Sequence, residues 1–292
     1  MIDVLLPFYG EPELMRLAVR SVLDQDTTGW RLVIVDDCYP DAATSDWLFS
    51  LQDPDVVYVR NERTLGVNGN FHRALSLATA EHVVFMGCDD LMEPGYVAAV
   101  QRAIAQHPAA AIVCPGVQVI DDAGRAVEPL VDRVKRFLRP SADGSVTLAG
   151  EDALVSLMSG NWTYFPSLCW RRDVITDIDF RPEYGVVLDL GLLVDVLVAG
   201  GELVVLPDRL FRYRRHAGSE SATKTVVGAR FEEERRYFGT IATELDRSGL
   251  RRAARAARGH VTSRLHAASL LPVAARNRDR AAMARLLRHA TR

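Results

Sequence analysis

The chain has 292 residues, of which 48% are hydrophobic and 25% are charged, a balance typical of a folded globular protein rather than a disordered or fibrous one. Its length suits one large α/β domain or two ordinary domains. The net charge of −3 conceals an asymmetry: residues 229–292 contain fifteen arginines against six acidic residues, or +9, which leaves −12 for residues 1–228.

Cysteine usage and apolar runs limit the class of protein further. The four cysteines are scattered without a Cys-x-x-Cys spacing, which argues against a zinc site or a disulfide framework. The first residues contain no basic leader and no small-residue cleavage pattern, and nowhere do eighteen apolar residues run together. We therefore expect a cytoplasmic protein that does not span a membrane.

The first 114 residues alternate between short apolar runs and helical patterns. Strands are expected at residues 2–6, 31–37, 56–60, 83–90 and 111–114. Helices are expected up to Gln25, through Ala74 to Ala78, and over 94–106. Strands that alternate with helices predict an α/β fold, with a mostly parallel, Rossmann-like sheet flanked by helices and joined by right-handed crossovers.

Two of these strands end in paired carboxylates, namely Asp36 with Asp37 and Asp89 with Asp90. In an open α/β sheet the ligand crevice lies outside the carboxyl ends of the strands. Carboxylates there can accept hydrogen bonds from a nucleobase or a ribose, and they can hold Mg²⁺ or Mn²⁺ together with diphosphate oxygens. The alternative for the second pair is that it only opens a helix, because Glu-Pro-Gly follows at 93–95.

The second half of the chain is less regular. Residues 128–149 mix proline, glycine, serine and charge without a clear period, so we expect a loop excursion that covers an active site. A helix is expected at 151–159 and another at 188–199, where Asp189 would ordinarily be a cap or a partner of the helix dipole. Two strands are expected at 203–206 and 210–214.

From Ala229 onward the sequence is rich in alanine and arginine and predicts three appended helices, at 229–247, 250–270 and 278–290. The simplest interpretation of their basic face is contact with solvent. The alternatives are an anionic acceptor or peripheral contact with headgroups at the inner face of a membrane. A nucleic-acid partner is disfavoured, because the acidic body would repel a phosphate backbone and the tail lacks interleaved aromatic residues.

Five ordered stretches carry a family resemblance: 5–9 with 21–25; 33–41; Asn61 with Gly66, 69–71 and Ala74; 85–90 with Pro94; and 213–214 with His216 and Ser221. With these stretches, residues 1–225 resemble the family 2 glycosyltransferases, nucleotide-sugar enzymes of the GT-A fold. The resemblance implies a catalytic domain at 1–225, with a nucleotide-binding half at 1–114 and an acceptor half at 115–225. Residues 226–292 would then form a basic helical segment.

The resemblance also implies roles for individual residues. Donor-binding residues would be Pro7, Tyr9, Asp36, Asp37, Arg63, Asn70 and Asp89. Asp37, with Asp36 and Arg63 nearby, would contact the nucleobase, and Asp89 would face the ribose and the sugar. Asp90 and His216 would hold a manganese or magnesium ion on the diphosphate.

Asp189 falls where the family places its general base. In that role it would take a proton from the acceptor hydroxyl and direct an inverting transfer. The acceptor is left open between a glycan, a lipid-linked molecule and a small molecule.

Three positions depart from the family pattern. Gly87 stands where many relatives carry another Asp, Leu188 stands where an acidic residue often precedes the base, and His72 replaces a common Asn. The first departure thins the set of metal ligands, and the second weakens the case for Asp189 as the base.

Two rival functions stay open at this point. A sugar-phosphate nucleotidyltransferase would need a glycine-rich loop with a basic residue directly after the first strand, where this chain has Phe-Tyr-Gly-Glu at 8–11. A non-catalytic relative that only binds a nucleotide sugar has no evident need for Asp189.

Overall fold

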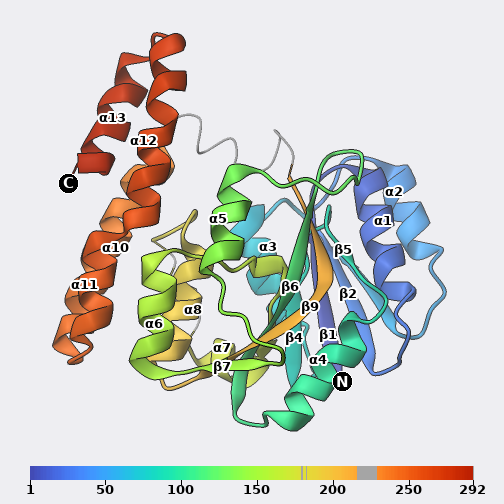
Figure 1. The fold of residues 1–292 in the computed structure, drawn as a ribbon. Helices are drawn as coiled ribbons and strands as arrows, with labels where there is room; N and C mark the ends of the chain where they lie inside the picture. The colour runs from blue at the N-terminus through green and yellow to red at the C-terminus, as the bar shows by residue number, and fades with distance from the viewer. Residues whose placement is uncertain (179, 182, 216–228, 292) are drawn as a thin grey trace.

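A computed structural model describes residues 1–178, 180–181, 183–215 and 229–291 of the chain. Its centre is a nine-stranded sheet in the order β3-β2-β1-β4-β8-β6-β9-β5, with β7 paired to β9 (Figure 1). Helices cover both faces of this sheet, and a group of helices from the C-terminal part of the chain stands at one end of it. The predicted α/β class is thus present.

The first half of the chain forms the parallel part of the sheet and one short strand, at the opposite edge, that pairs antiparallel. Its elements are β1 (Ile2–Phe8), α1 (Pro12–Leu23), β2 (Trp30–Asp36), α2 (Ala42–Phe49), β3 (Val56–Arg60), α3 (Gly66–Ser76), β4 (His82–Phe85), β5 (Leu91–Met92) and α4 (Tyr96–Gln106). β1 pairs in parallel with both β2 and β4, and β2 pairs in parallel with β3. Strand β1 runs through Pro7, which lies opposite Val35, so proline does not end it as the sequence suggested.

The second half makes the sheet mixed. Its elements are β6 (Ala110–Ile120), α5 (Leu130–Leu138), β7 (Val146–Leu148), α6 (Gly150–Ser159), η1 (Phe165–Ser167), β8 (Cys169–Arg171), α7 (Arg172–Ile178), α8 (Leu188–Val198) and β9 (Glu202–Arg214). β8 runs antiparallel to β4 and β6, whereas β6 and β9 pair in parallel. The two strands expected at 203–206 and 210–214 are one continuous strand.

The expectation of a loop without secondary structure over 128–149 is wrong. The segment contains helix α5 and strand β7, and β7 pairs antiparallel with β9. Helix α5 carries apolar residues at helical spacing, at positions 130, 131, 134, 137 and 138, so the sequence did contain a period for it. What is unusual is that most of this apolar stripe faces outward. Leu130 is 68% exposed and Phe137 is 88% exposed, while Asp132 on the same helix is buried.

Two hydrophobic cores hold the layers together. On one face of the sheet, α1 and α4 pack with Ile2, Val4 and Leu6 of β1. On the other face, α3, α6 and α8 pack with the alternate residues of β1 and β2, such as Leu5 and Val33. This alternation is expected for a strand that is covered on both faces, since successive side chains point to opposite sides.

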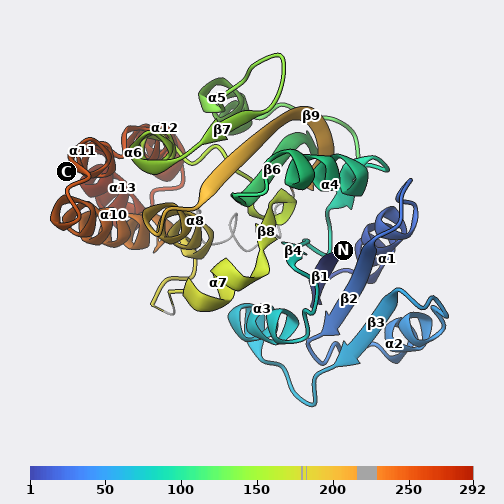
Figure 2. The same ribbon diagram turned by 90° about the horizontal axis from the view of Figure 1, so that it is seen from below.

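The C-terminal helices are α10 (Ala229–Arg247), α11 (Arg251–Gly259), α12 (Val261–Arg276) and α13 (Arg280–Thr291). The single helix expected over 250–270 is divided at His260, whose φ of 26° breaks the helix. Figure 2 shows α10 and α11 beside α6 and α8, and side chains of α10 and α11 share the core of the sheet. The described helices α10 and α11 therefore share one hydrophobic core with the sheet.

Part of the basic charge of these helices is neutralised within the protein. Arg252 pairs with Glu151 and Asp152 of α6, and Arg258 pairs with Asp246. No helix in the described ranges is both long enough and apolar enough to cross a membrane.

Candidate active site

The carboxyl ends of β1, β2 and β4 bring the predicted donor residues to one edge of the sheet. The Asp37 amide donates to the Phe8 carbonyl across 2.9 Å, which joins the ends of β1 and β2. Tyr9 follows β1 at this edge with 57% of its surface exposed, and its ring lies 5.6 Å from that of Tyr39. Pro7 is half-buried within β1.

Asp36 and Asp37 face different surroundings, because neighbouring residues at a strand end point in opposite directions. The Asp36 side chain is fully buried and accepts hydrogen bonds of 2.7 Å from the Tyr39 amide and the Tyr58 hydroxyl. It also lies 3.5 Å from the Arg60 guanidinium. Its carboxylate thus fastens β2 to β3 from inside the fold.

The Asp37 carboxylate organises the loop between β3 and α3. One of its oxygens accepts from the Asn61 side chain at 2.9 Å and from the Leu65 amide at 2.7 Å. The other accepts from the Gly66 amide at 2.9 Å. Asn70 extends this network, because its side chain accepts from Asn61 and donates to a carbonyl of β2.

Arg63 lies on the loop that this network holds, and its side chain is exposed. Gly66 begins α3 with a φ of +75°, a backbone conformation in the left-handed region that glycine adopts readily. The loop therefore presents one cation at the edge where Tyr9 and Asp37 lie.

The second pair of carboxylates is packed against Gly87. Asp90 is 1% exposed, and its Oδ1 accepts from the Arg214 amide across 2.8 Å. A Cβ atom placed on Gly87 would stand 2.5 Å from Asp90 Oδ2 and 3.1 Å from Asp89 Oδ1. The absence of a side chain at position 87 is what lets both carboxylates fold toward it.

Burial raises the pKa of Asp90 well above its ordinary value, and the neighbouring charge of Asp89 raises it further. A divalent cation would relieve both effects, and hard cations favour carboxylate oxygens together with those of a diphosphate. Asp89 and Asp90 fit such an ion, although no group of three or more metal-binding side chains occurs among residues that the structure describes. His216, the other predicted ligand, falls outside these residues.

Asp189 lies in the first turn of α8, where its Oδ1 accepts from the Leu190 amide across 2.7 Å. Burial raises the pKa of this carboxyl. The hydrogen bond from the Leu190 amide and the positive charges of Lys135 and Arg230 lower the pKa of Asp189 and so favour its carboxylate form. A carboxyl with a raised pKa is suited to exchanging a proton near neutral pH.

Tyr213, near the end of β9, is affected by the charges of carboxylates on the predicted donor edge and on α8. Its pKa is raised to about 12, first by burial and then by the charges of Asp90, Asp89 and Asp189. The three predicted carboxylates therefore lie within electrostatic range of one tyrosine. These groups lie on the loop after β4, at the end of β9 and in the first turn of α8.

Sequence reasoning missed a polar cluster at this site. Asp132 of α5 accepts from the Tyr164 hydroxyl at 2.7 Å and from the Arg215 guanidinium at 2.6 and 2.8 Å. Lys135, one turn along α5, donates to the Thr163 carbonyl at 2.6 Å and lies over the Tyr164 ring at 4.2 Å.

One signal for this cluster was present in the sequence. Lys135 is one of only two lysines in a chain with 33 arginines, so a lysine at this position is unusual for this sequence. Burial, and then the positive charge of Arg215, lower the pKa of Lys135 to about 8. A lysine at this point can hold or release a proton in a range that arginine cannot reach.

The sequence pattern of the family described as "Glycosyl transferase family 2" matches residues 3–149, which is half of the chain. The chain belongs to glycosyl transferase family 2. The resemblance expected from the five sequence stretches is thereby confirmed.

Curated relatives of this family member have related names. The chain is 30% identical over 95 residues to the putative colanic acid biosynthesis glycosyl transferase WcaA of Escherichia coli K12, covering 32% of this chain and 34% of WcaA. It is 34% identical over 94 residues to the putative teichuronic acid biosynthesis glycosyltransferase TuaG of Bacillus subtilis 168, covering 31% of this chain and 36% of TuaG. These matches span about a third of each relative.

The fold itself matches a solved glycosyltransferase structure. Residues 1–349 of Staphylococcus aureus TarS, in complex with UDP-GlcNAc, superpose with a TM-score of 0.64 and 18% identity, covering 84% of this chain and 66% of that one. The predicted GT-A fold is confirmed by this likeness, which concerns the fold alone.

Proposed function

We propose that this family 2 member transfers a sugar from a nucleoside-diphosphate sugar to a hydroxyl group of an acceptor. The observation that supports the proposal is the buried Asp90 carboxylate, held by the Arg214 amide at the end of β9, next to Tyr213, on which the charges of Asp89, Asp90 and Asp189 all act. The complex of TarS with UDP-GlcNAc supports a nucleoside-diphosphate sugar as the class of donor.

In this proposal the donor lies across the edge formed by β1, β2 and β4. The nucleobase lies near Tyr9, Asp37 and Arg63, and Asp89 accepts hydrogen bonds from the ribose and the transferred sugar. Asn70 and the buried Asp36 act indirectly, because their hydrogen bonds hold the loop and the strand ends in place.

Asp90 would hold a manganese or magnesium ion, with His216 as a further predicted ligand. When bound, this ion supplies positive charge beside the diphosphate and offsets the negative charge that builds up as the diphosphate leaves. The Arg214 amide fixes the Asp90 carboxylate so that its second oxygen points toward Gly87 and the donor.

Asp189 acts as the general base. It takes the proton of the acceptor hydroxyl while the hydroxyl oxygen forms a bond to the anomeric carbon, and the bond from that carbon to the diphosphate oxygen breaks. Attack from the face opposite the diphosphate inverts the configuration of the anomeric carbon. The positive charge of Lys135 keeps Asp189 in the carboxylate form that accepts the proton.

The test is a thermal-shift and hydrolysis screen of the purified chain against UDP-, dTDP- and GDP-sugars, with and without Mn²⁺. We expect stabilisation and slow release of the nucleoside diphosphate with one donor class, both dependent on the metal. Stabilisation without any release in the presence of candidate acceptors would favour a protein that binds nucleotide sugars without transferring them. The absence of a metal-dependent response to every donor would contradict the proposal.

A further inference from the structure

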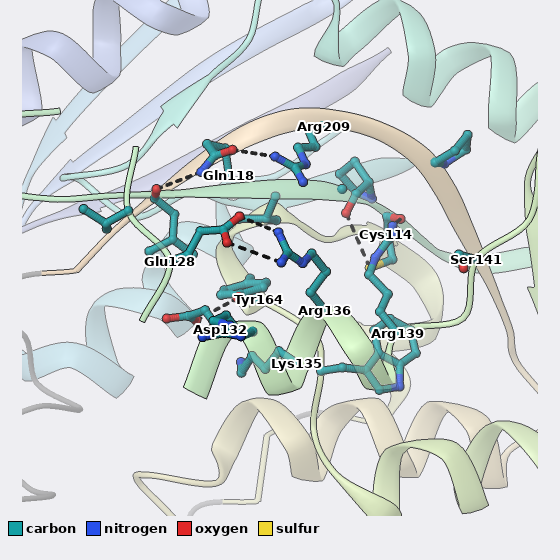
Figure 3. A pocket seen from close by; sticks show the side chains of 18 residues that line it. Cys114, Gln118, Glu128, Asp132, Lys135, Arg136, Arg139, Ser141, Tyr164 and Arg209 are labelled. Atoms are coloured by element: carbon teal, nitrogen blue, oxygen red, sulfur yellow. Dashed lines mark hydrogen bonds and ion pairs between the residues drawn. The ribbon is translucent and has the colours of Figure 1, made fainter. Parts of the chain in front are cut away.

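A pocket of about 260 Å³ lies between helix α5 and the strands β6 and β9 (Figure 3). Seven charged residues line it: Arg133, Lys135, Arg136, Arg139, Arg209, Glu128 and Asp132. Five cations therefore stand against two carboxylates in a chain whose first 228 residues carry a net charge of −12. Such a local excess of positive charge in a concave site attracts anions.

Three guanidinium groups converge on this pocket. Figure 3 shows Arg136 and Arg139 rising from α5 toward Arg209, which comes from β9. Arg139 is fixed by the carbonyls of Cys114 and Leu206, at 3.3 and 2.6 Å, and Arg209 donates to Gln118 Oε1 across 2.7 Å. Neutral partners position these two arginines without cancelling their charge.

The two carboxylates of the pocket leave much of this charge uncompensated. Asp132 already accepts hydrogen bonds from the Tyr164 hydroxyl and from Arg215. Part of its negative charge is therefore balanced by Arg215, which does not line the pocket. Glu128 pairs with Arg136, and both side chains of that pair are about half exposed. A solvent-exposed pair of this kind contributes little stability, and an incoming anion can replace Glu128 as the partner of Arg136.

The pocket and the active site share a wall. Lys135 and Tyr164 line the pocket, and the Tyr164 ring packs against that of Tyr213 with their centroids 5.1 Å apart. In the proposed site, a molecule with a hydroxyl at Asp189 would extend past Tyr164 into the pocket beneath α5. The donor residues on β1, β2 and the loop after β3 do not line this pocket.

We propose that the pocket beneath α5 binds an anionic group of the acceptor, a carboxylate or a phosphate, through Arg136, Arg139 and Arg209. This inference rests on the proposed function, because it assigns the chemical class of the molecule whose hydroxyl meets Asp189. Guanidinium groups suit both anions, since their paired N–H donors match two oxygens of a carboxylate or a phosphate.

The test measures binding of two probes, inorganic phosphate and glucuronate, to the whole chain by NMR titration in EDTA. The variants are Arg209→Gln and Arg136→Gln, whose side chains lie at the open side of the pocket. Arg102→Gln on α4 is the matched control, because Arg102 is an exposed arginine outside the pocket. Equal melting temperatures for all variants would show that folding is retained.

We expect each pocket variant to weaken binding of at least one probe about tenfold, as loss of one charge-assisted hydrogen bond implies, while Arg102→Gln binds like the wild type. Binding of glucuronate alone identifies an acidic sugar, binding of phosphate alone identifies a phosphate ester, and binding of both supports a general anion site. Unchanged binding in both pocket variants, or no binding of either probe to the wild type, would overturn the proposal.

A further variant, Arg63→Gln, separates this proposal from the proposed function. Arg63 lies on the predicted donor loop, so the variant should bind the anionic probes normally. If Arg63→Gln no longer binds the probes while Arg209→Gln still binds them, the anion binds at the proposed donor edge. In that case the pocket proposal fails and the proposed transfer reaction stands. If the donor screen fails but the pocket variants lose the probes, the pocket binds anions and the transfer reaction is wrong.

Discussion

The side-chain amide of Asn61 donates to the Asp37 carboxylate across 2.9 Å, and this bond ties the end of β2 to the loop that enters α3. Asp37 is 2% exposed and also accepts from the amides of Leu65 and Gly66. One side chain therefore sets the shape of the loop that carries Arg63. The shape of the proposed donor edge therefore depends on Asp37 in the free protein as well.

Replacement of Asp37 by Ala should lower the free energy of unfolding by about 2 kcal/mol, because buried N–H donors lose their acceptor. It should also weaken binding of the nucleoside diphosphate. Urea denaturation and calorimetric titration measure the two effects. The control is Asp41→Ala, which removes the cap of α2 and should cost about 1 kcal/mol while sparing nucleotide binding. Equal nucleotide affinity in both variants would argue against the assigned donor edge.

Replacement of Gly87 by Ala should displace the Asp89 and Asp90 carboxylates, because the new Cβ would stand 2.5 Å from Asp90 Oδ2. We expect metal-dependent donor binding to weaken at least tenfold, measured as the Mn²⁺ concentration needed for half of the thermal shift. Gly239→Ala is the matched control, since a Cβ there meets nothing within 4 Å inside α10. That control should raise stability by about 0.5 to 1 kcal/mol. A normal response to Mn²⁺ in Gly87→Ala would remove the pair from the metal site.

Replacement of Lys135 by Met should move the acidic limb of the pH–rate profile to higher pH. The sign follows because Lys135 is charged below its pKa of about 8, and this charge lowers the pKa of Asp189. Without it Asp189 is protonated at a higher pH and loses its ability to accept a proton. Asp189→Asn should abolish transfer and preserve donor binding. Arg133→Gln replaces an exposed residue of the same helix and should leave the acidic limb at the wild-type pH. An unmoved limb in Lys135→Met would contradict the base assignment.

Stability should fall as the pH is lowered from about 6.5 to about 4, because of a buried histidine in the C-terminal helices. His289 is 1% exposed and bonds to Ser263 at 2.7 Å, with Glu234 and His260 as its titratable neighbours. Burial lowers its pKa to about 4, below the ordinary value of 6.5. The unfolded chain therefore takes up the proton first, and stability that is complete above pH 6.5 is lost through this window.

The loss attributable to His289 is on the order of 2 kcal/mol. Urea denaturation at pH 7 and at pH 4.5 measures it as the difference between the wild type and His289→Gln. The variant should be less sensitive to pH. His107→Gln, in the turn after α4, should keep the wild-type dependence. The same pH dependence in His289→Gln and the wild type would exclude this origin.

The parallel half of the fold was predictable because its sequence obeys simple rules. Strands β1, β2 and β4 are short apolar runs covered on both faces, and paired carboxylates follow β2 and β4. What the local sequence cannot reveal is which partners each carboxylate of a pair finds. Asp36 and Asp37 are adjacent, chemically identical and both buried, but Asp36 bonds to Tyr58 of β3 whereas Asp37 bonds to the loop that enters α3.

The acceptor half was less predictable because helix α5 inverts the usual pattern. Its apolar residues Leu130 and Phe137 face solvent, while Asp132 is buried and Lys135 is half-buried against Tyr164. Polar residues are buried there because Arg215 and Tyr164, both distant in sequence, supply their partners. The apolar residues of α5 follow a helical period, but a period cannot report that the apolar side is exposed and the polar side buried.

Helix α5 belongs to the segment that joins β6 to β7, and the donor residues on β1, β2 and β4 lie outside that segment. If the proposed function holds, donor and acceptor contacts therefore come from separate segments of the chain. Exchange of residues 121–145 with the corresponding segment of another family member is then the smallest graft that should change the acceptor while the donor stays the same. One sheet could in this way serve different acceptors through a change in a single connecting segment.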